Sequence, residues 1–182
     1  MGSAQKSTGP ARVIRAVALD YGGVLDDRSR PRDDAGNHPV DASCIEPLLE
    51  LAALGLVLIV STNTEPGQHR RAALRDAGID GLFRVVLASD CLGVRKPHPA
   101  FFAMAAAAAG CAPESVLHVG DRIEPDILGP VRCGMQTALL RPDGLTERER
   151  AQVPRCMWII RHVRELPGLV ASRAEGGSRG DG

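Results

Sequence analysis

Two carboxylates, Asp121 and Asp126, stand five residues apart in the segment 117–132, and the first follows Gly120 at the end of a short apolar run. A strand that ends at a Gly-Asp turn presents its carboxylate at the C-terminal edge of a sheet, where open α/β sheets bind ligands. Two acids at this spacing suit Mg²⁺, because this cation takes oxygen ligands. Such a pair is also typical of a solvated loop, so the prediction of a metal site depends on partners from other segments.

Three further segments supply such partners. Residues 13–19 form an apolar run that ends at Asp20, and residues 56–60 form another that ends at Ser61-Thr62-Asn63. Lys96 lies in a proline-flanked turn at residues 93–99. Strands that alternate with helical stretches form a parallel sheet, and all their C-termini then lie on one edge. We therefore expect the acids, the hydroxyl group and the lysine to meet there.

With four such segments in this order, the chain resembles the haloacid dehalogenase (HAD) superfamily of aspartate-nucleophile phosphohydrolases over residues 12–170. The motifs that carry the resemblance are Asp20-x-Gly-Gly-Val-Leu, Thr62-Asn63, Lys96-Pro97-x-Pro99 and Gly120-Asp121-x-x-x-x-Asp126. The resemblance implies an α/β fold, a Rossmann-like three-layer sandwich with a mainly parallel sheet of about five strands and no cap domain.

The resemblance also implies a Mg²⁺-dependent phosphatase that hydrolyses a phosphomonoester through an aspartyl-phosphate. Asp20 matches the nucleophile, and a carboxylate attacking phosphorus needs a cation and fixed donors to activate the ester. The metal ligands would be Asp20, the backbone carbonyl group of Gly22 and Asp121. Asp126 would support the site by orienting water or Lys96.

Three residues match the positions that bind the phosphoryl group. Thr62 would offer its hydroxyl group, Asn63 its backbone N–H, and Lys96 would neutralise charge on the nucleophile and the substrate. Ser61 competes with Thr62 for this role, and we favour Thr62 because the family's hydroxyl residue is usually followed by Asn.

One departure from the family pattern concerns Gly22. Family phosphatases usually carry a second Asp there, which protonates the leaving group and then activates water, a contribution typically worth ~10²–10⁴-fold. Three explanations remain. In the first, Asp26 or Asp27 replaces the acid, or the leaving group needs no acid. In the second, the chain follows another family chemistry, such as that of a dehalogenase or phosphonatase, and in the third it is a catalytically impaired relative that binds a phosphorylated ligand or a protein partner. The intact Asp121–Asp126 pair disfavours a dehalogenase.

The absence of room for a cap has consequences for partners. The stretch between Asp20 and Ser61 holds a polar loop at 26–41 and one helix, so the site should be open. A phosphorylated macromolecule could then reach it, or a second copy of the chain could close it over a small phosphorylated molecule. Arg95 and Arg122 flank motif residues and are candidates for binding a second anionic group.

Composition favours a single cytoplasmic domain. The 182 residues carry a net charge of zero, so no overall field favours nucleic acid or membrane. The 5 cysteines are scattered, which favours reduced thiols. No signal peptide or membrane span is expected, since the N-terminal residues are polar and no apolar stretch is long enough.

The remaining patterns predict the other elements. Strands are expected at 83–87, 115–119, 136–140 and, as a short edge strand, 157–160. Helices are expected at 43–53, 65–77, 99–109, 125–133 and 162–169. Residues 1–11 and 171–182 are expected to be a disordered N-terminus and tail.

Overall fold

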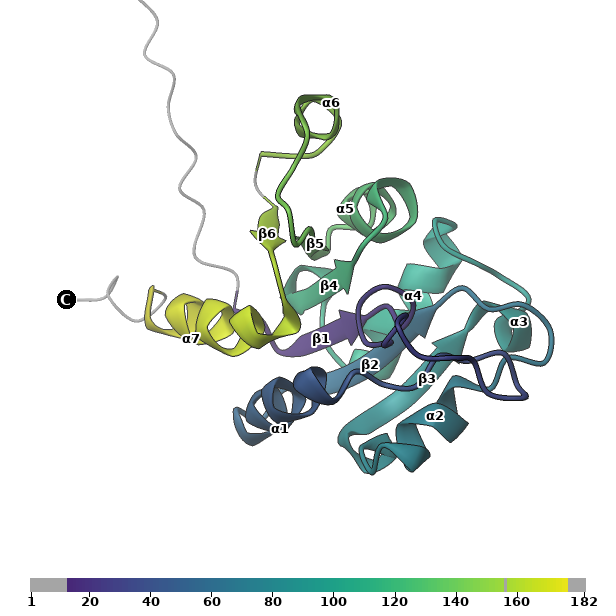
Figure 1. Ribbon diagram of the computed structural model, residues 1–182. Helices are drawn as coiled ribbons and strands as arrows, with labels where there is room; N and C mark the ends of the chain where they lie inside the picture. Colours follow the sequence, from purple (N-terminus) through teal and green to yellow (C-terminus); the bar gives the residue numbers. More distant parts are fainter. Residues whose placement is uncertain (1–12, 156, 177–182) are drawn as a thin grey trace, which may run out of the picture.

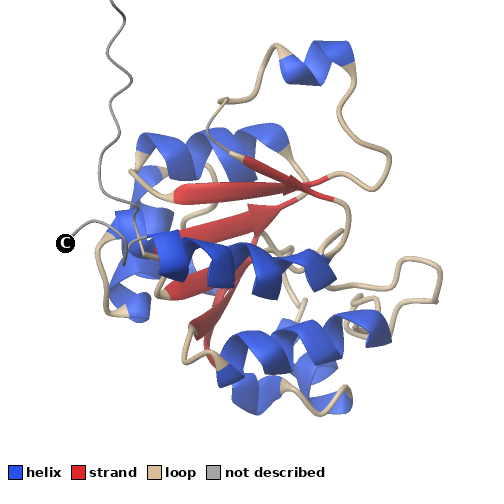
Figure 2. Cartoon of the chain, turned by 90° about the vertical axis from the view of Figure 1, so that its left-hand side faces the viewer, coloured by secondary structure: helices blue, strands red, loops and turns tan. Residues whose placement is uncertain are grey.

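The computed structural model of the protein describes residues 13–155 and 157–176. Its centre is a six-stranded sheet of order β3-β2-β1-β4-β5-β6, and every pair of neighbouring strands is parallel. The strands are β1 (Ala16–Leu19), β2 (Val57–Thr62), β3 (Phe83–Ala88), β4 (Val116–Gly120), β5 (Gln136–Leu140) and β6 (Trp158–Ile160). Figures 1 and 2 show helices on both faces of this sheet, which confirms the three-layer α/β fold. Within the described ranges no separate cap domain is present.

The central strand β1 shows how the sequence builds this sandwich. Alternate residues of a strand point to opposite faces. Val17 and Leu19 accordingly pack into one hydrophobic cluster, while Ala16 and Ala18 pack into the other. All four side chains are fully buried. A strand that is apolar on both faces is expected for the middle of a parallel sheet covered by helices.

The helices divide between the two faces. On one face, α1 (Ile45–Ala53), α2 (Arg70–Asp76) and α7 (Leu166–Gly176) contribute to the larger core cluster. On the other, α4 (Pro99–Ala109) supplies Phe101 and Phe102 to the second cluster and contacts α5 (Gly129–Arg132). The remaining helical segments are the 3-10 turns Ala42–Cys44, Asp80–Leu82, Pro113–Ser115 and Val163–Glu165, the π-helix Ile123–Leu128, and the short helices α3 (Ser89–Leu92) and α6 (Glu147–Arg150).

Several element boundaries differ from the sequence predictions. The sheet has six strands rather than about five, because the edge strand expected at 157–160 pairs with β5 as β6. Helix α2 begins at Arg70 rather than at 65, since Glu65 and Gln68 close a separate hydrogen-bonded turn. The helix expected at 125–133 divides into the π-helix and α5, and neither α3 nor α6 was predicted.

The chain ends are described only in part. Helix α7 continues to Gly176, so residues 171–176 are helical and do not belong to the expected tail. The predictions for 1–11 and for 177–182 lie outside the described residues. Across the described ranges, no helix combines the length and apolar character required to cross a membrane.

Candidate active site

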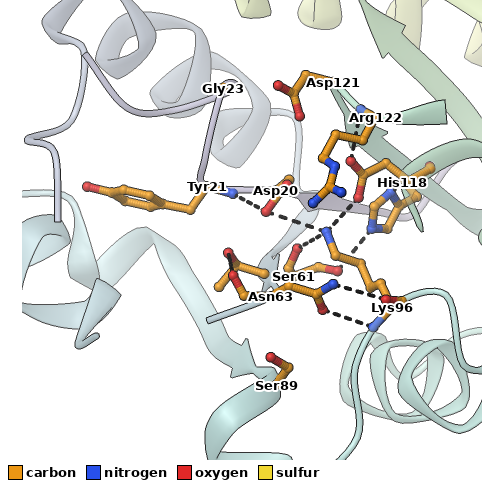
Figure 3. Close-up of polar contacts among 12 residues, drawn as sticks. Asp20, Tyr21, Gly23, Ser61, Asn63, Ser89, Lys96, His118, Asp121 and Arg122 are labelled. Atoms are coloured by element: carbon orange, nitrogen blue, oxygen red, sulfur yellow. Dashed lines mark hydrogen bonds and ion pairs between the residues drawn. The ribbon is translucent and has the colours of Figure 1, made fainter. Parts of the chain in front are cut away.

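The ends of three adjacent strands bring the predicted residues together. Because β2, β1 and β4 are neighbours in parallel register, their C-terminal ends lie on the same edge of the sheet. Thr62 ends β2, Asp20 follows β1 directly, and Asp121 follows β4. Figure 3 shows Asp20 and Ser61 facing the end of the Lys96 side chain, with Asp121 farther from it. The expectation that the motifs meet at one edge is confirmed by this arrangement.

Lys96 is buried among oxygen atoms, and only 3% of the residue is exposed. Its Nζ atom lies 2.6 Å from Asp126 Oδ1, 2.7 Å from the backbone oxygen of Ser61 and 3.4 Å from Asp20 Oδ1. The backbone of Lys96 is clamped by the Asn63 side chain, which accepts from Lys96 N and donates to Lys96 O, both at 2.9 Å. Lys96 thus reaches the sheet edge in a fixed position.

Asp126 is fully buried and serves Lys96 as a counter-ion. Its other carboxylate oxygen, Oδ2, accepts a hydrogen bond from the backbone N–H of Arg122 at 3.1 Å. Gly120 makes this approach possible, because a Cβ atom at that position would overlap the Asp126 side chain. The glycine before Asp121 is therefore needed for close packing as well as for the turn.

His118 bridges Ser61 and Asp126, the two residues that accept hydrogen bonds from the Lys96 ammonium group. Its Nδ1 lies 3.0 Å from the backbone oxygen of Asp126, and its Nε2 lies 2.9 Å from Ser61 Oγ. Burial, together with the nearby Lys96 charge, lowers the pKa of His118 to about 3, so the ring is neutral. Since a carbonyl oxygen can only accept, Nδ1 carries the proton and Nε2 accepts from the Ser61 hydroxyl group. No motif in the sequence indicates this bridge.

Asp20, Asp121 and Asp126 form a cluster whose carboxylate oxygens lie within 4.8 Å of one another. Burial raises the pKa of Asp121 to about 6, and the nearby charges of Asp20 and Asp126 add to the effect. Asp121 Oδ1 is buried and has no hydrogen-bond partner. An unpartnered carboxylate oxygen beside a second acid fits a hard divalent cation such as Mg²⁺. Because Asp126 is engaged by Lys96, Asp20 and Asp121 are the side chains available to hold the ion.

The turn after β1 is shaped to bring Asp121 close to Asp20. Gly23 has a φ of +77°, which side-chain-bearing residues rarely adopt. A Cβ atom there would also overlap the Asp121 carboxylate. The Asp20 carboxylate is oriented by this turn, since its Oδ1 accepts from the backbone N–H of Tyr21 at 2.7 Å.

A small cavity of about 120 Å³ opens beside these groups. Its lining contains Asp20, Gly22, Thr62, Asn63, Lys96 and Asp126 from the predicted set. Thr62 rather than Ser61 lines the cavity, in agreement with the choice made from the sequence.

Other candidates lie outside the cavity lining. Asp26 instead accepts from the backbone N–H of Gly23, and Asp27 from Ser29, so neither replaces the missing acid at Gly22 in this structure. Arg95 lies near Glu65 on the surface, at 3.6 Å.

Two arginines that the sequence did not indicate, Arg28 and Arg70, line the cavity together with Arg122. Arg28 lies in the polar loop after β1, and Arg70 opens α2. Neither belongs to a motif with a defined spacing, so only the folded chain reveals that they reach the site.

Comparisons with known proteins identify relatives of this chain. A family model for haloacid dehalogenase-like hydrolases matches residues 32–134. The glyceraldehyde 3-phosphate phosphatase of Methanopyrus kandleri is 36% identical over 97 residues, which cover 53% of this chain and 41% of that protein. The phosphoserine phosphatase of Thermus thermophilus is 33% identical over 141 residues, which cover 72% of this chain and 56% of that protein. The chain thus spans about half the length of the curated relatives it matches.

Solved structures share the fold. An uncharacterised protein from Listeria monocytogenes superposes with a TM-score of 0.73 at 20% identity, covering 89% of this chain and 99% of that one. The L-2-haloacid dehalogenase of Xanthobacter autotrophicus gives 0.70 at 17% identity, covering 87% and 99%. At these identities the likeness concerns the fold alone. Since the family model matches more than half of the sequence and the motifs converge on one site, this chain belongs to the haloacid dehalogenase-like hydrolase family.

Proposed function

We propose that this protein is a Mg²⁺-dependent phosphatase that hydrolyses a phosphomonoester through an aspartyl-phosphate on Asp20. The observation that carries the proposal is the buried Lys96 ammonium group, which lies between Asp20 and Asp126 and lines a small cavity. The named phosphatases among the relatives support the same reaction type. The open, capless site admits a phosphorylated small molecule or macromolecule, and a second copy of the chain could close it.

Asp20 is the nucleophile in this proposal. Its carboxylate attacks phosphorus, the bond from phosphorus to the ester oxygen breaks, and the leaving oxygen takes a proton from solvent water to depart as the alcohol. Tyr21 N–H and Lys96 both face Asp20 Oδ1, which holds the carboxylate in one orientation and leaves Oδ2 free of these donors. Fixed orientation of the reacting group is a substantial part of such catalysis. Water then attacks the phosphorus of the aspartyl-phosphate, which releases phosphate and restores Asp20.

The charge that develops on the phosphoryl oxygens needs fixed positive partners. Lys96 supplies one, and Thr62 and Asn63, whose hydroxyl group and backbone N–H are the proposed further donors, line the same cavity. Mg²⁺, held by Asp20, Asp121 and the carbonyl group of Gly22, would clamp the phosphoryl group and neutralise charge. Donors arranged before the reaction starts need no reorganisation when the charge appears, which makes them effective in a buried site.

A second function competes on one specific observation. Gly22 cannot transfer a proton, and neither Asp26 nor Asp27 lines the cavity. The chain could therefore be a catalytically impaired relative that binds a phosphorylated ligand or a protein partner. A dehalogenase is the third candidate; the fold likeness does not favour it, and Asp121 fits a metal ion.

Phosphate release from a panel of aryl and alkyl phosphomonoesters, with and without Mg²⁺, tests the proposal. Mg²⁺-dependent release that is lost in Asp20→Asn is the expected result. No release above the Asp20→Asn background, together with retained phosphate binding, would favour the binding protein. Chloride release from 2-chloropropionate without added metal would favour the dehalogenase.

A further inference from the structure

Two of the arginines at the cavity have no carboxylate partner among the described residues. Arg28 lies 3.5 Å from Asp26 and 3.6 Å from Asp121, so its charge is compensated locally. Neither Arg70 nor Arg122 forms an ion pair with any described residue, yet both line the cavity that holds Asp20. These two guanidinium groups are positive charges that line the site without a direct carboxylate contact.

Arg70 is held in place by neutral groups. It donates to Asn37 Oδ1 at 3.0 Å and to Gln68 Oε1 at 2.9 Å, and its guanidinium carbon lies 4.8 Å from the centre of the Tyr21 ring. Asn37 is fully buried and is itself fixed by two hydrogen bonds from its amide group to Asp33. A guanidinium group carries five N–H donors, so these contacts position Arg70 and leave donors for a ligand.

Arg122 approaches the same cavity from the other side of β1. It follows β4, while Arg70 opens the helix after β2, and these two strands flank β1 in the sheet. The backbone N–H of Arg122 is anchored on Asp126 Oδ2, and Figure 3 shows its side chain extending toward the side of Asp20 and Lys96. The two unpaired arginines therefore flank the proposed nucleophile.

The charges indicate what such an arrangement accepts. Lys96 is compensated by Asp20 and Asp126, and it would share the phosphoryl group with the metal ion in the proposed reaction. Arg70 and Arg122 form no ion pair with the acids of the site, and both line the cavity, so their N–H donors are available to a further anionic group of the substrate. Guanidinium groups bind carboxylate and phosphate through paired hydrogen bonds, which neutral alcohols cannot offer.

We propose, on the basis of the phosphatase function above, that Arg70 and Arg122 select phosphomonoesters whose leaving group carries a second anionic group. That group is a carboxylate or a second phosphate. Because both arginines line the same small cavity as Asp20, the second anion lies a few bonds from the phosphorus atom. In the open, capless site, these arginines perform the substrate selection.

A matched pair of substrates tests the selection. 2-Phosphoglycolate carries a carboxylate, and 2-hydroxyethyl phosphate has a similar length without one; ethylene glycol bisphosphate distinguishes a second phosphate from a carboxylate. We expect kcat/KM for at least one of the two charged substrates to exceed that for the neutral one by about tenfold or more. Arg122→Gln and Arg70→Gln should each lower this ratio, whereas Arg132→Gln, an exposed arginine paired with Glu124, should leave it unchanged.

The variants also separate selection from folding. Arg122 is exposed, so its replacement should not disturb the core. Arg70→Gln removes the charge and also the hydrogen bond to Asn37, so Arg70→Lys, which keeps the charge, is measured beside it. The inference is overturned if the wild-type protein hydrolyses charged and neutral substrates equally well, or if Arg122→Gln retains the full preference.

Binding to Asp20→Asn, measured by calorimetry with Mg²⁺ present, distinguishes failure of the inference from failure of the proposed function. If the wild-type protein shows no turnover but Asp20→Asn binds 2-phosphoglycolate more tightly than 2-hydroxyethyl phosphate, and Arg122→Gln removes the difference, only the phosphatase function fails. Turnover without any preference overturns the selection alone. Absence of binding and of turnover with every probe overturns both.

Discussion

Lys96 and Asp126 form a fully buried ion pair in which Nζ lies 2.6 Å from Oδ1. The same ammonium group lies 3.4 Å from Asp20 Oδ1, so the supporting acid is closer to the lysine than the proposed nucleophile is. Asp126 therefore fixes the position of the Lys96 ammonium group, and Asp20 lies farther from that group than Asp126 does. In the motif Gly120-Asp121-x-x-x-x-Asp126, the second acid therefore pairs with Lys96 and is not free to hold a metal ion.

Loss of Asp126 should destabilise the protein strongly. Asp126→Ala leaves a buried ammonium group without its main counter-ion, and breaking a buried pair in this way costs about 3–5 kcal/mol. Urea denaturation measures the change in the free energy of unfolding. Glu124→Ala is the matched control, because it breaks the exposed Arg132–Glu124 pair of similar length, 2.7 Å, and should cost at most about 1 kcal/mol. Equal effects of the two substitutions would contradict the buried pairing.

His118 should make the protein sensitive to mild acid. Its pKa is lowered to about 3 in the folded protein by burial, whereas an unfolded histidine titrates near 6.5. As the pH falls below about 6.5, the unfolded state binds a proton that the folded state does not, so the free energy of unfolding decreases. Between about pH 7 and pH 5, the wild-type protein should lose about 2 kcal/mol more than His118→Asn does. Urea denaturation of both proteins at several pH values measures this difference, and parallel losses would contradict the neutral, buried ring.

Asp121 should cost stability when no metal ion is bound. Its pKa is raised from 3.8 to about 6 in the folded protein, so the free energy of unfolding falls as the pH rises between these two values, and the full loss is present above about pH 6. Asp121→Asn should therefore raise the free energy of unfolding at neutral pH by up to about 3 kcal/mol in the presence of a chelator. Thermal denaturation at neutral pH, compared between the wild-type protein and the variant, measures the gain.

Added Mg²⁺ should reverse that order. It should raise the melting temperature of the wild-type protein, because it binds the folded state, and should have little effect on Asp121→Asn. Asp27→Asn is a suitable control, since the exposed Asp27 carboxylate has its pKa lowered by Ser29 and its loss should not stabilise the protein. A less stable Asp121→Asn protein in chelator would contradict the raised pKa of Asp121. An equal response of both proteins to Mg²⁺ would argue against Asp121 as a metal ligand.

The sequence was sufficient to predict that Asp20, Thr62 and Asp121 lie close together, because each stands at the end of an apolar strand. Strand β5 and helix α4 were predicted with the observed boundaries, since the first is a clear apolar run and the second is bounded by Pro99 and Gly110. Convergence of the motifs followed from parallel strand pairing alone. These features are local, or they depend on a general rule of sheet topology.

The features that were missed depend on contacts between distant parts of the chain. The hydroxyl group of Ser61 meets His118 across 57 positions, and Arg70 meets Asn37 across 33. No spacing in the sequence announces such pairs, because their side chains come from separate elements. Arg95, expected at the site from its neighbour Lys96, instead faces the surface, since successive residues of a turn point in different directions.

Restoring the acid at position 22 should increase turnover. A Cβ atom on Gly22 would meet only Arg28, at an ordinary contact distance of 3.6 Å, so the turn can accommodate a side chain there. Gly22→Asp should raise kcat for alkyl phosphates about a hundredfold, because the carboxyl group can protonate the leaving oxygen. Gly22→Asn has the same size without the proton and should show no gain. Unchanged turnover in Gly22→Asp would mean that another group already supplies the proton.

The most direct test of the account is a pre-steady-state experiment with p-nitrophenyl phosphate and Mg²⁺. The nitrophenolate leaving group of this substrate needs little protonation, so the first step should be fast. Hydrolysis of the aspartyl-phosphate should be slow, because Gly22 cannot act as the base that activates water. We therefore expect a burst of p-nitrophenol approaching one equivalent per protein, and acid quenching should show a phosphoryl group on the tryptic peptide 16–28, which contains Asp20. Steady turnover without a burst and without phosphate on that peptide would contradict Asp20 as the nucleophile.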